Sequence, residues 1–157
     1  MTIKETGIEG LLIVEPKVFM DPRGFFYESY HQERLSGHGV NYQFIQDNQS
    51  RSAYGVIRGL HYQKHPHTQA KIVRVTEGAI FDVAVDLRKK SPTYGAWEGV
   101  ELSAENRHQL WVPPGFAHGF LVLSESADVL YKTTDYYAPE HERTIAWDDP
   151  KLAIKWP

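Results

Sequence analysis

Short runs of β-branched and aromatic residues recur along the whole chain, and single Gly and Pro residues separate them. Such runs are typical of β-strands, whereas only residues 31–39, which end at a glycine, have the composition of a short helix. About ten short strands with minor helix predict an all-β sandwich or jelly roll. The expected strands are residues 11–14, 24–30, 42–50, 55–63, 70–78, 79–88, 97–103, 107–114, 115–124 and 127–137, with 143–147 as a further candidate.

The composition narrows the class of protein. A length of 157 residues favours one compact domain over residues 1–157. With no cysteine, disulfides, thiolate nucleophiles and Cys-ligated metals are excluded. The net charge of −3 argues against a nucleic acid polymer or an anionic membrane as the partner. No apolar run approaches the ~18 residues of a membrane span or forms a signal core, so we expect a cytoplasmic protein.

Two polar residues interrupt rows that are otherwise apolar. In the expected strand 70–78, Lys71 shares a face with Val73, because alternate side chains of a strand point the same way. In the strand 127–137, Tyr131 shares a face with Val129, and continued alternation would place Tyr137 there too. Both polar residues are candidates for chemistry, although a snorkelling lysine and a satisfied core phenol are the plain alternatives.

The segment Arg58-Gly-Leu-His61-Tyr-Gln is the densest in chemically useful groups. An imidazole transfers protons near neutral pH, although a lone histidine is more often structural. Strict alternation would separate Arg58 and His61 onto opposite faces. A β-bulge at Gly59 would bring the two side chains to the same face.

The segment Pro113-Pro-Gly-Phe-Ala-His118 matches the P-x-G-x-x-H pattern of the second cupin motif. The first cupin motif normally supplies two histidines and a glutamate for a metal. Here His65 and His67 have the H-x-H spacing, but no carboxylate follows before Lys71. Because a lysine near the metal position opposes a divalent cation, we expect a cupin-like jelly roll without a metal site.

The chain as a whole resembles the dTDP-4-dehydrorhamnose 3,5-epimerase family, in order from Leu11 to Pro157. The resemblance lies in the runs FMDPRGFFYESY, QDNQS, RGLHYQ, QAKIVRV, FDVAVDLRKKSPTYG, LSAEN, WVPPGFAHGFLVLS, YKTTDYYAPEHE and WDDP. It implies a cupin-like jelly roll that inverts carbons 3 and 5 of dTDP-4-keto-6-deoxyglucose. Both carbons flank a ketone, so the chemistry needs a base, an acid and enolate stabilisation but no redox cofactor.

The resemblance also implies a role for each site residue. His61 is the base, Tyr131 is the acid on the opposite face, and Lys71 stabilises the enolate oxygen and binds substrate. Arg23 and Arg58 bind the diphosphate, for which a guanidinium is well suited. Tyr137 stacks on the thymine base. The remaining residues expected around the nucleotide sugar are Glu28, Gln46, Asp47, Asn48, His118 and Glu142.

The resemblance implies a C-terminal carboxylate that pairs with the catalytic histidine, whereas this sequence ends at Pro157, so either the sequence is truncated or another group orients the histidine. An orienting carboxylate fixes the tautomer of an imidazole and stabilises its cation. Asp82 is the candidate substitute, because it lies in a strand rich in Val and Ala. A solvent-facing strand acid is an equally weighted reading of Asp82.

Three alternatives to the double epimerase remain open. A relative that inverts one carbon, or that isomerises the ketone, would have nearly the same sequence. A metal-dependent oxygenase would use His61, His65, His67 or His118, and a non-catalytic jelly roll would only bind sugars. The resemblance further implies a homodimer in which an N-terminal strand crosses to the partner, and the aromatic segment 24–30 would suit such an interface or a monomeric core.

Overall fold

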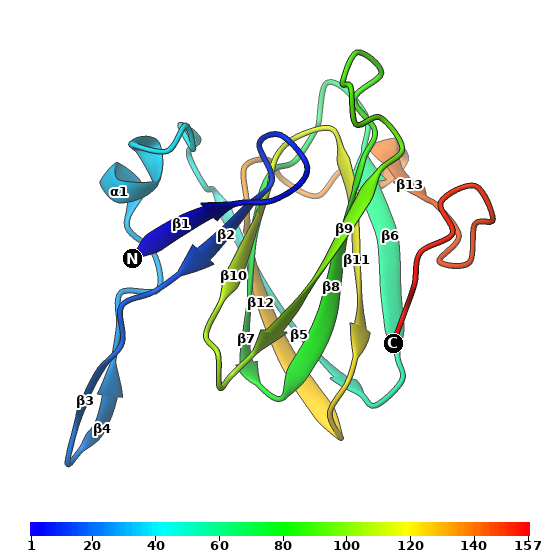
Figure 1. The fold of residues 1–157 in the computed structure, drawn as a ribbon. Helices are drawn as coiled ribbons and strands as arrows, with labels where there is room; N and C mark the ends of the chain where they lie inside the picture. Colours follow the sequence, from blue (N-terminus) through cyan, green and yellow to red (C-terminus); the bar gives the residue numbers. More distant parts are fainter.

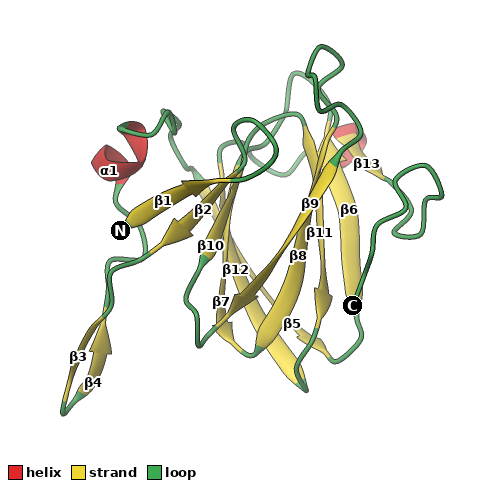
Figure 2. Ribbon diagram, in the orientation of Figure 1, coloured by secondary structure: helices red, strands yellow, loops and turns green.

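The computed structural model describes residues 1–157, and its regular secondary structure consists almost entirely of β-strands (Figures 1 and 2). Its only α-helix is α1 (Gln32–Ser36), and a short 3₁₀ turn (Pro139–His141) precedes the last strand. The strands are β1 (Thr2–Glu5), β2 (Leu12–Glu15), β3 (Phe19–Asp21), β4 (Gly24–Phe26), β5 (Gln46–Ala53), β6 (Ile57–Gln63), β7 (Lys71–Glu77), β8 (Ala79–Asp86), β9 (Trp97–Ser103), β10 (Gln109–Val112), β11 (Phe116–Val122), β12 (Ser126–Thr133) and β13 (Glu142–Thr144).

Two antiparallel sheets form the body of the molecule. The first has the strand order β1-β2-β10-β7-β12-β5, and the second has the order β13-β6-β11-β8-β9. Sequence neighbours are often separated in these sheets, as expected for a jelly roll rather than a meander. The predicted all-β, cupin-like fold is therefore confirmed, although the sequence pattern missed the short strands β1 and β3.

The main core lies between the two sheets. Val73 and Val129 of the six-stranded sheet pack there with Ile80 and Phe120 of the five-stranded sheet. Both outer faces are also partly covered. Residues 30–44 pack on the outside of the six-stranded sheet around Trp111, and residues 145–156 cover the outside of the five-stranded sheet.

Polar residues line part of the space between the sheets. Strand register places Lys71 beside Thr133, and Tyr131 beside Val73, on the inner face of the first sheet. On the second sheet His61 is paired with His118. These residues lie toward the end at which β12 leads into the loop before β13, the upper end in Figure 1. The apolar core fills the rest of this space and fixes the separation of the two walls.

The hairpin β3–β4 stands away from this body as an arm, at the lower left in Figure 1. The expected strand 24–30 ends at Phe26, and the aromatic residues of the arm are not part of the core. Four large apolar side chains are exposed on it, namely Phe19, Met20, Phe25 and Phe26, with 52%, 70%, 57% and 66% of their surface accessible. Residues 24–26 are therefore not part of a monomeric core, whereas Tyr30, at the end of the expected strand, packs against the buried cluster around Trp111.

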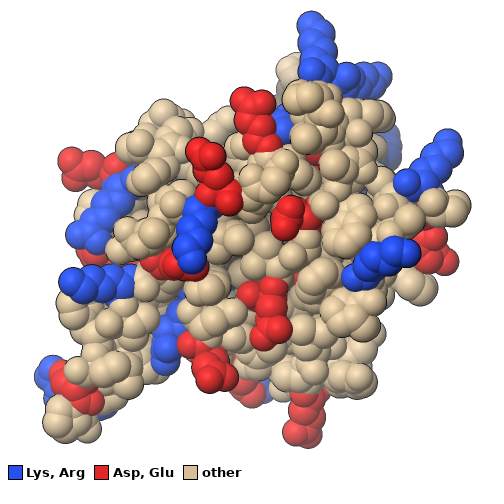
Figure 3. Space-filling model, in the orientation of Figure 1, with Lys and Arg blue, Asp and Glu red and all other residues tan.

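Charged side chains of both signs are interspersed over the face shown in Figure 3. No helix in the structure has the length and apolar character required to span a membrane.

Candidate active site

One wall of the candidate site is β6, and an irregularity at Gly59 shapes it. His118 pairs with His61 and Phe120 pairs with Arg58, so β6 contains one more residue than β11 across this interval. Gly59 has φ of 120°, and a Cβ there would lie only 2.6 Å from the Cα of Gly119. The predicted bulge is confirmed. It lets Arg58 reach across to β5, where its Nε donates to Ser52 Oγ at 2.8 Å.

A buried imidazole–carboxylate pair lies behind His61. His118 Nε2 and Asp82 Oδ1 are 2.7 Å apart, and Asp82 is fully buried. The solvent-facing reading of Asp82 is therefore wrong. Its expected contact with His61 is wrong as well, because β8 pairs with β11, which lies between β8 and β6. The carboxylate orients His118, the cross-strand neighbour of His61.

The facing wall carries the lysine and the phenol. Lys71 and Tyr131 both point into the inter-sheet space from β7 and β12, as the apolar rows around them predicted. Lys71 Nζ lies 5.7 Å from the centre of the Tyr131 ring. His61 lies close enough to Lys71 for the charge of the lysine to act on it, and Lys71 and Tyr131 project from the opposite sheet. A base on one sheet and a phenol on the other is an arrangement that two-sided proton transfer would use.

Burial shifts the pKa values of all three groups. It lowers the pKa of Lys71 to about 8, although the carboxylates of Asp82 and Glu142 oppose the shift. It lowers the pKa of His61 below its ordinary value, again against the field of Glu142. Burial raises the pKa of Tyr131, so the phenol stays protonated at neutral pH. The resting site therefore combines a neutral imidazole, a titratable lysine and an intact proton donor.

These shifts predict a bell-shaped pH dependence of kcat/KM. As pH falls below His61's ordinary pKa of 6.5, the imidazole takes up a proton and can no longer act as a base. As pH rises through about 8, Lys71 loses the charge that would stabilise an enolate. A pH–rate profile of solvent exchange measures both limbs. Lys71→Arg should move the alkaline limb upward, because a guanidinium stays charged; an unmoved limb would assign it to another group.

Residues of β5, of β13 and of the loop that joins β12 to β13 form the rim of the site. Gln46 and Asn48 share the inner face of β5, and Gln46 Nε2 donates to Asn48 Oδ1 at 2.9 Å. Tyr137 donates from its backbone N–H to Gln46 Oε1 at 3.2 Å and from its hydroxyl to Glu142 Oε2 at 3.0 Å. Because β12 ends at Thr133, the predicted strand alternation out to Tyr137 is wrong; the loop brings Tyr137 to the rim.

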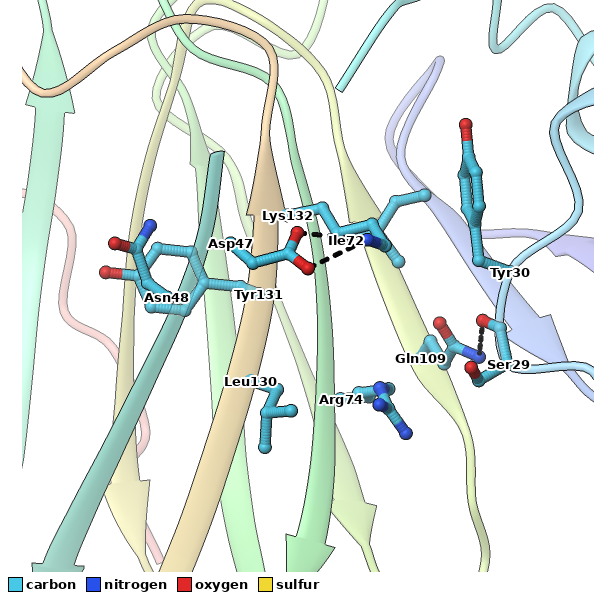
Figure 4. A pocket seen from close by; sticks show the side chains of 10 residues that line it. All are labelled: Ser29, Tyr30, Asp47, Asn48, Ile72, Arg74, Gln109, Leu130, Tyr131 and Lys132. Atoms are coloured by element: carbon cyan, nitrogen blue, oxygen red, sulfur yellow. Dashed lines mark hydrogen bonds and ion pairs between the residues drawn. The ribbon is translucent and has the colours of Figure 1, made fainter. Parts of the chain in front are cut away.

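Asp47 does not join this rim. Alternation along β5 turns its side chain to the outer face of the sheet, where the Oδ1 atom accepts from Lys132 Nζ at 2.9 Å. Figure 4 shows this ion pair beside an outer-face pocket that Tyr30 and Arg74 also line. In the same view Asn48 and Tyr131 point the other way, toward the inter-sheet space. The expected contact of the Asp47 side chain with substrate is therefore not supported within this site.

Arg23 and Glu28 are likewise outside the inter-sheet site of their own chain. Arg23 lies at the tip of the arm, where it pairs with Asp21 at 2.6 Å and its side chain is 89% exposed. Glu28 follows the arm and accepts from Arg34 Nη1 at 2.6 Å. The structure thus brings together eight of the predicted site residues: Gln46, Asn48, Arg58, His61, Lys71, His118, Tyr131 and Glu142, with Tyr137 at the rim.

Sequence reasoning missed Ser52 and Gln63, which also face this space. Gln63 lies two residues after His61 and is paired with Glu142 on the same face. Strand alternation from His61 was the signal that could have identified it.

A cupin-like β sandwich that holds an imidazole, a lysine and a phenol around one inter-sheet space defines an acid–base enzyme. The sequence profile described as "dTDP-4-dehydrorhamnose 3,5-epimerase" matches residues 5–157. The chain therefore belongs to the dTDP-4-dehydrorhamnose 3,5-epimerase family.

Individual relatives agree with this assignment. The chain is 59% identical to a dTDP-4-dehydrorhamnose 3,5-epimerase of Pseudomonas aeruginosa, over 100% of this chain and 87% of the relative. It is also similar to the crystal structure of a dTDP-6-deoxy-D-glucose-3,5-epimerase from Legionella pneumophila in complex with dTDP-4-keto-L-rhamnose. That similarity has a TM-score of 0.96 and 56% identity and covers 99% of this chain and 83% of the other. A dTDP-4-dehydrorhamnose 3-epimerase of Streptomyces niveus is 41% identical, over 100% of this chain and 76% of the relative.

Proposed function

We propose that residues 1–157 form one catalytic domain that inverts carbons 3 and 5 of dTDP-4-keto-6-deoxyglucose, giving dTDP-4-keto-L-rhamnose. The observation that carries this proposal is the placement of His61 on one sheet opposite Lys71 and Tyr131 on the other. A hexose held between these walls would present one ring face to a base and the other to an acid. Membership of the epimerase family supports the same reaction.

The proposed reaction moves only protons. His61 removes the hydrogen from a carbon next to the ketone, and the electron pair of the C–H bond forms an enolate on the ketone oxygen. Lys71, while cationic, stabilises that oxygen, because a preorganised charge in a water-poor site favours the developing anion. Tyr131 then protonates the same carbon from the opposite face, and the ketone re-forms. Solvent takes the proton from His61 and returns one to the Tyr131 phenolate, so that both groups are restored before the second carbon reacts. No electrons are gained or lost, so the cycle needs no redox cofactor.

Groups around the reacting carbons would hold the nucleotide. Arg58 is oriented by Ser52 and suits the diphosphate, since a guanidinium binds phosphate oxygens in pairs. Tyr137 is an exposed aromatic ring at the rim and suits the flat thymine base. Gln46, Asn48, His118 and Glu142 provide the polar contacts around the sugar.

Incubation with dTDP-4-keto-6-deoxyglucose in heavy water tests the proposal. We expect deuterium at carbons 3 and 5 and an L-configured product, both of which NMR detects. Label at one carbon only would instead identify a mono-epimerase such as the Streptomyces niveus relative. Tight dTDP binding without any label would make the protein a binding module.

We further propose that the enzyme acts as a homodimer in which the arm of one chain completes the site of the other. The exposed apolar side chains of the arm form the kind of surface that a partner covers. Arg23 and Glu28 cannot serve the inter-sheet site of their own chain from this position. A second copy, reached by a two-fold axis, would deliver both residues to a site that lacks them.

Mixing two defective variants tests this arrangement. In Arg23→Ala the arm is defective, and in His61→Asn the body is defective, so a heterodimer contains one complete site. Co-expression should restore formation of the inverted product to roughly a quarter of the wild-type rate, because half of the dimers then have one working site of two. A His61→Asn and Tyr131→Phe mixture is the control, since both residues belong to one body and no complete site forms. Recovery in the control alone, or in neither mixture, would contradict delivery across the dimer.

A further inference from the structure

Gln63 is a buried side chain whose amide group bonds only to backbone. It is the last residue of β6, and only 6% of its surface is accessible. Its Nε2 donates to the carbonyl of His67 at 2.7 Å and to the carbonyl of Tyr136 at 3.1 Å. Its Oε1 accepts from the N–H of Ala138 at 2.8 Å. Two of these three bonds therefore join the peptide groups on either side of Tyr137.

This bonding pattern requires a neutral amide of this length. A carboxylate would keep the bond to Ala138 but would face two carbonyl oxygens without a donor. A hydrocarbon side chain would leave all three backbone groups unpaired in a buried place, which is costly for each group. The amide thus joins the five-stranded sheet to the loop that carries Tyr137.

Little else fixes the position of Tyr137. It lies outside helix and strand, and 56% of its surface is accessible. Its backbone N–H is bound by Gln46 of the six-stranded sheet, and its hydroxyl is bound by Glu142. Gln63 bonds to the two peptide groups that flank Tyr137, from the opposite sheet, and the N–H groups of His141 and Glu142 bind the carbonyl of Ala138. An aromatic ring held in place before binding avoids the ordering cost that a mobile ring incurs.

We propose that Gln63 is a positioning residue that holds Tyr137 as a preformed stacking platform for the nucleotide base. This inference rests on the proposed function, in which Tyr137 receives thymine. Gln63 thereby sets nucleotide affinity without touching the nucleotide. Gln63 takes no part in the proton transfers, which His61 and Tyr131 carry out at the reacting carbons.

Binding and turnover of a Gln63→Leu variant separate this role from a structural one. Loss of an aromatic–base stack weakens binding by about 5- to 150-fold. For Gln63→Leu we expect an increase in the Kd for dTDP within this range, of at least about tenfold. KM should rise in parallel, while kcat changes by less than about threefold, as for an interaction equal in ground and transition states. A general folding defect would instead lower the active fraction and leave KM unchanged. Gln63→Asn, with the amide one methylene shorter, should change Kd in the same direction if the leucine variant does not fold.

Gln69→Leu is the matched control. Gln69 Nε2 donates to the carbonyl of Asp135 at 2.8 Å, in the same loop but not beside Tyr137. Its loss should change the Kd less than about threefold, because the peptide groups that flank the ring stay bound. Equal effects of the two leucine variants would overturn the proposal, as general anchoring of the loop would then explain both.

A double-mutant cycle with Tyr137→Leu provides the decisive comparison. If Gln63 acts through the ring, Gln63→Leu should change Kd by less than about twofold once the ring is gone. Independent, additive losses would overturn the proposal. Wild-type protein that fails to bind dTDP would count against the proposed function itself, whereas normal wild-type binding with unaffected Gln63 variants would reject only this inference.

Discussion

Replacing His61 by Asn is expected to abolish deuterium incorporation at both sugar carbons while leaving dTDP binding nearly unchanged. An amide has the approximate shape of one side of an imidazole but accepts no proton at neutral pH. A positioned general base contributes about 10²–10⁴-fold to a proton transfer. Because the same imidazole serves both carbons, we expect both exchange rates to fall by that order together.

The structure indicates that this substitution leaves the fold intact. His61 is half-buried and makes no hydrogen bond to another side chain of the protein, so its loss strands no buried partner. Exchange rates from NMR and the Kd for dTDP are the two measurements. His65→Asn is the control, because His65 is exposed in a turn beyond β6. Exchange that persists in His61→Asn would identify another base.

The chemistry of the inter-sheet walls could be predicted because it depends on local alternation. A lysine or phenol in a row of valines must face the same space as those valines, whatever strand lies opposite. Lys71 and Tyr131 are where this rule places them. Gly59 marked the bulge for an equally local reason, since only a residue without Cβ allows β6 and β11 to approach so closely there.

Interactions across strands could not be predicted in this way. Asp82 pairs with His118 rather than His61 because β11 lies between β8 and β6, and strand order depends on the whole chain. Alternation also gives a wrong prediction beyond the end of a strand when the sequence does not indicate where the strand ends. Tyr137 follows the end of β12 at Thr133, so its position depends on Gln63 and Gln46 instead of on parity.

The arm shows a third limit of sequence reasoning. Its aromatic residues have the composition of a core strand, and nothing in the sequence distinguishes burial in this chain from burial in a partner. The structure separates the two cases by exposing Phe25 and Phe26 and by placing Arg23 outside its own site. Assembly is thus inferred from what the single chain leaves incomplete.

Replacing Tyr131 by Phe is expected to uncouple exchange from inversion. The ring remains, so its packing on the core and its contact with Lys71 are kept. Only the hydroxyl, which binds no other side chain, is lost. His61 can still form the enolate and return a proton to the face from which it came. Deuterium should therefore still enter the sugar, at a rate within about tenfold of wild type, because abstraction does not use the phenol.

The inverted product should meanwhile fall by about 10²–10⁴-fold, the usual contribution of a positioned general acid. NMR of one reaction in heavy water measures both outcomes, as label in recovered substrate and as new signals of the L-sugar. Tyr62→Phe is the control, because Tyr62 packs on the outer face of the same sheet as His61. If Tyr131→Phe inverted carbons normally, water would be the acid. If the variant lost exchange as well, the phenol would be required to form the enolate. Abstraction by His61 and protonation by Tyr131 would then not be separate steps.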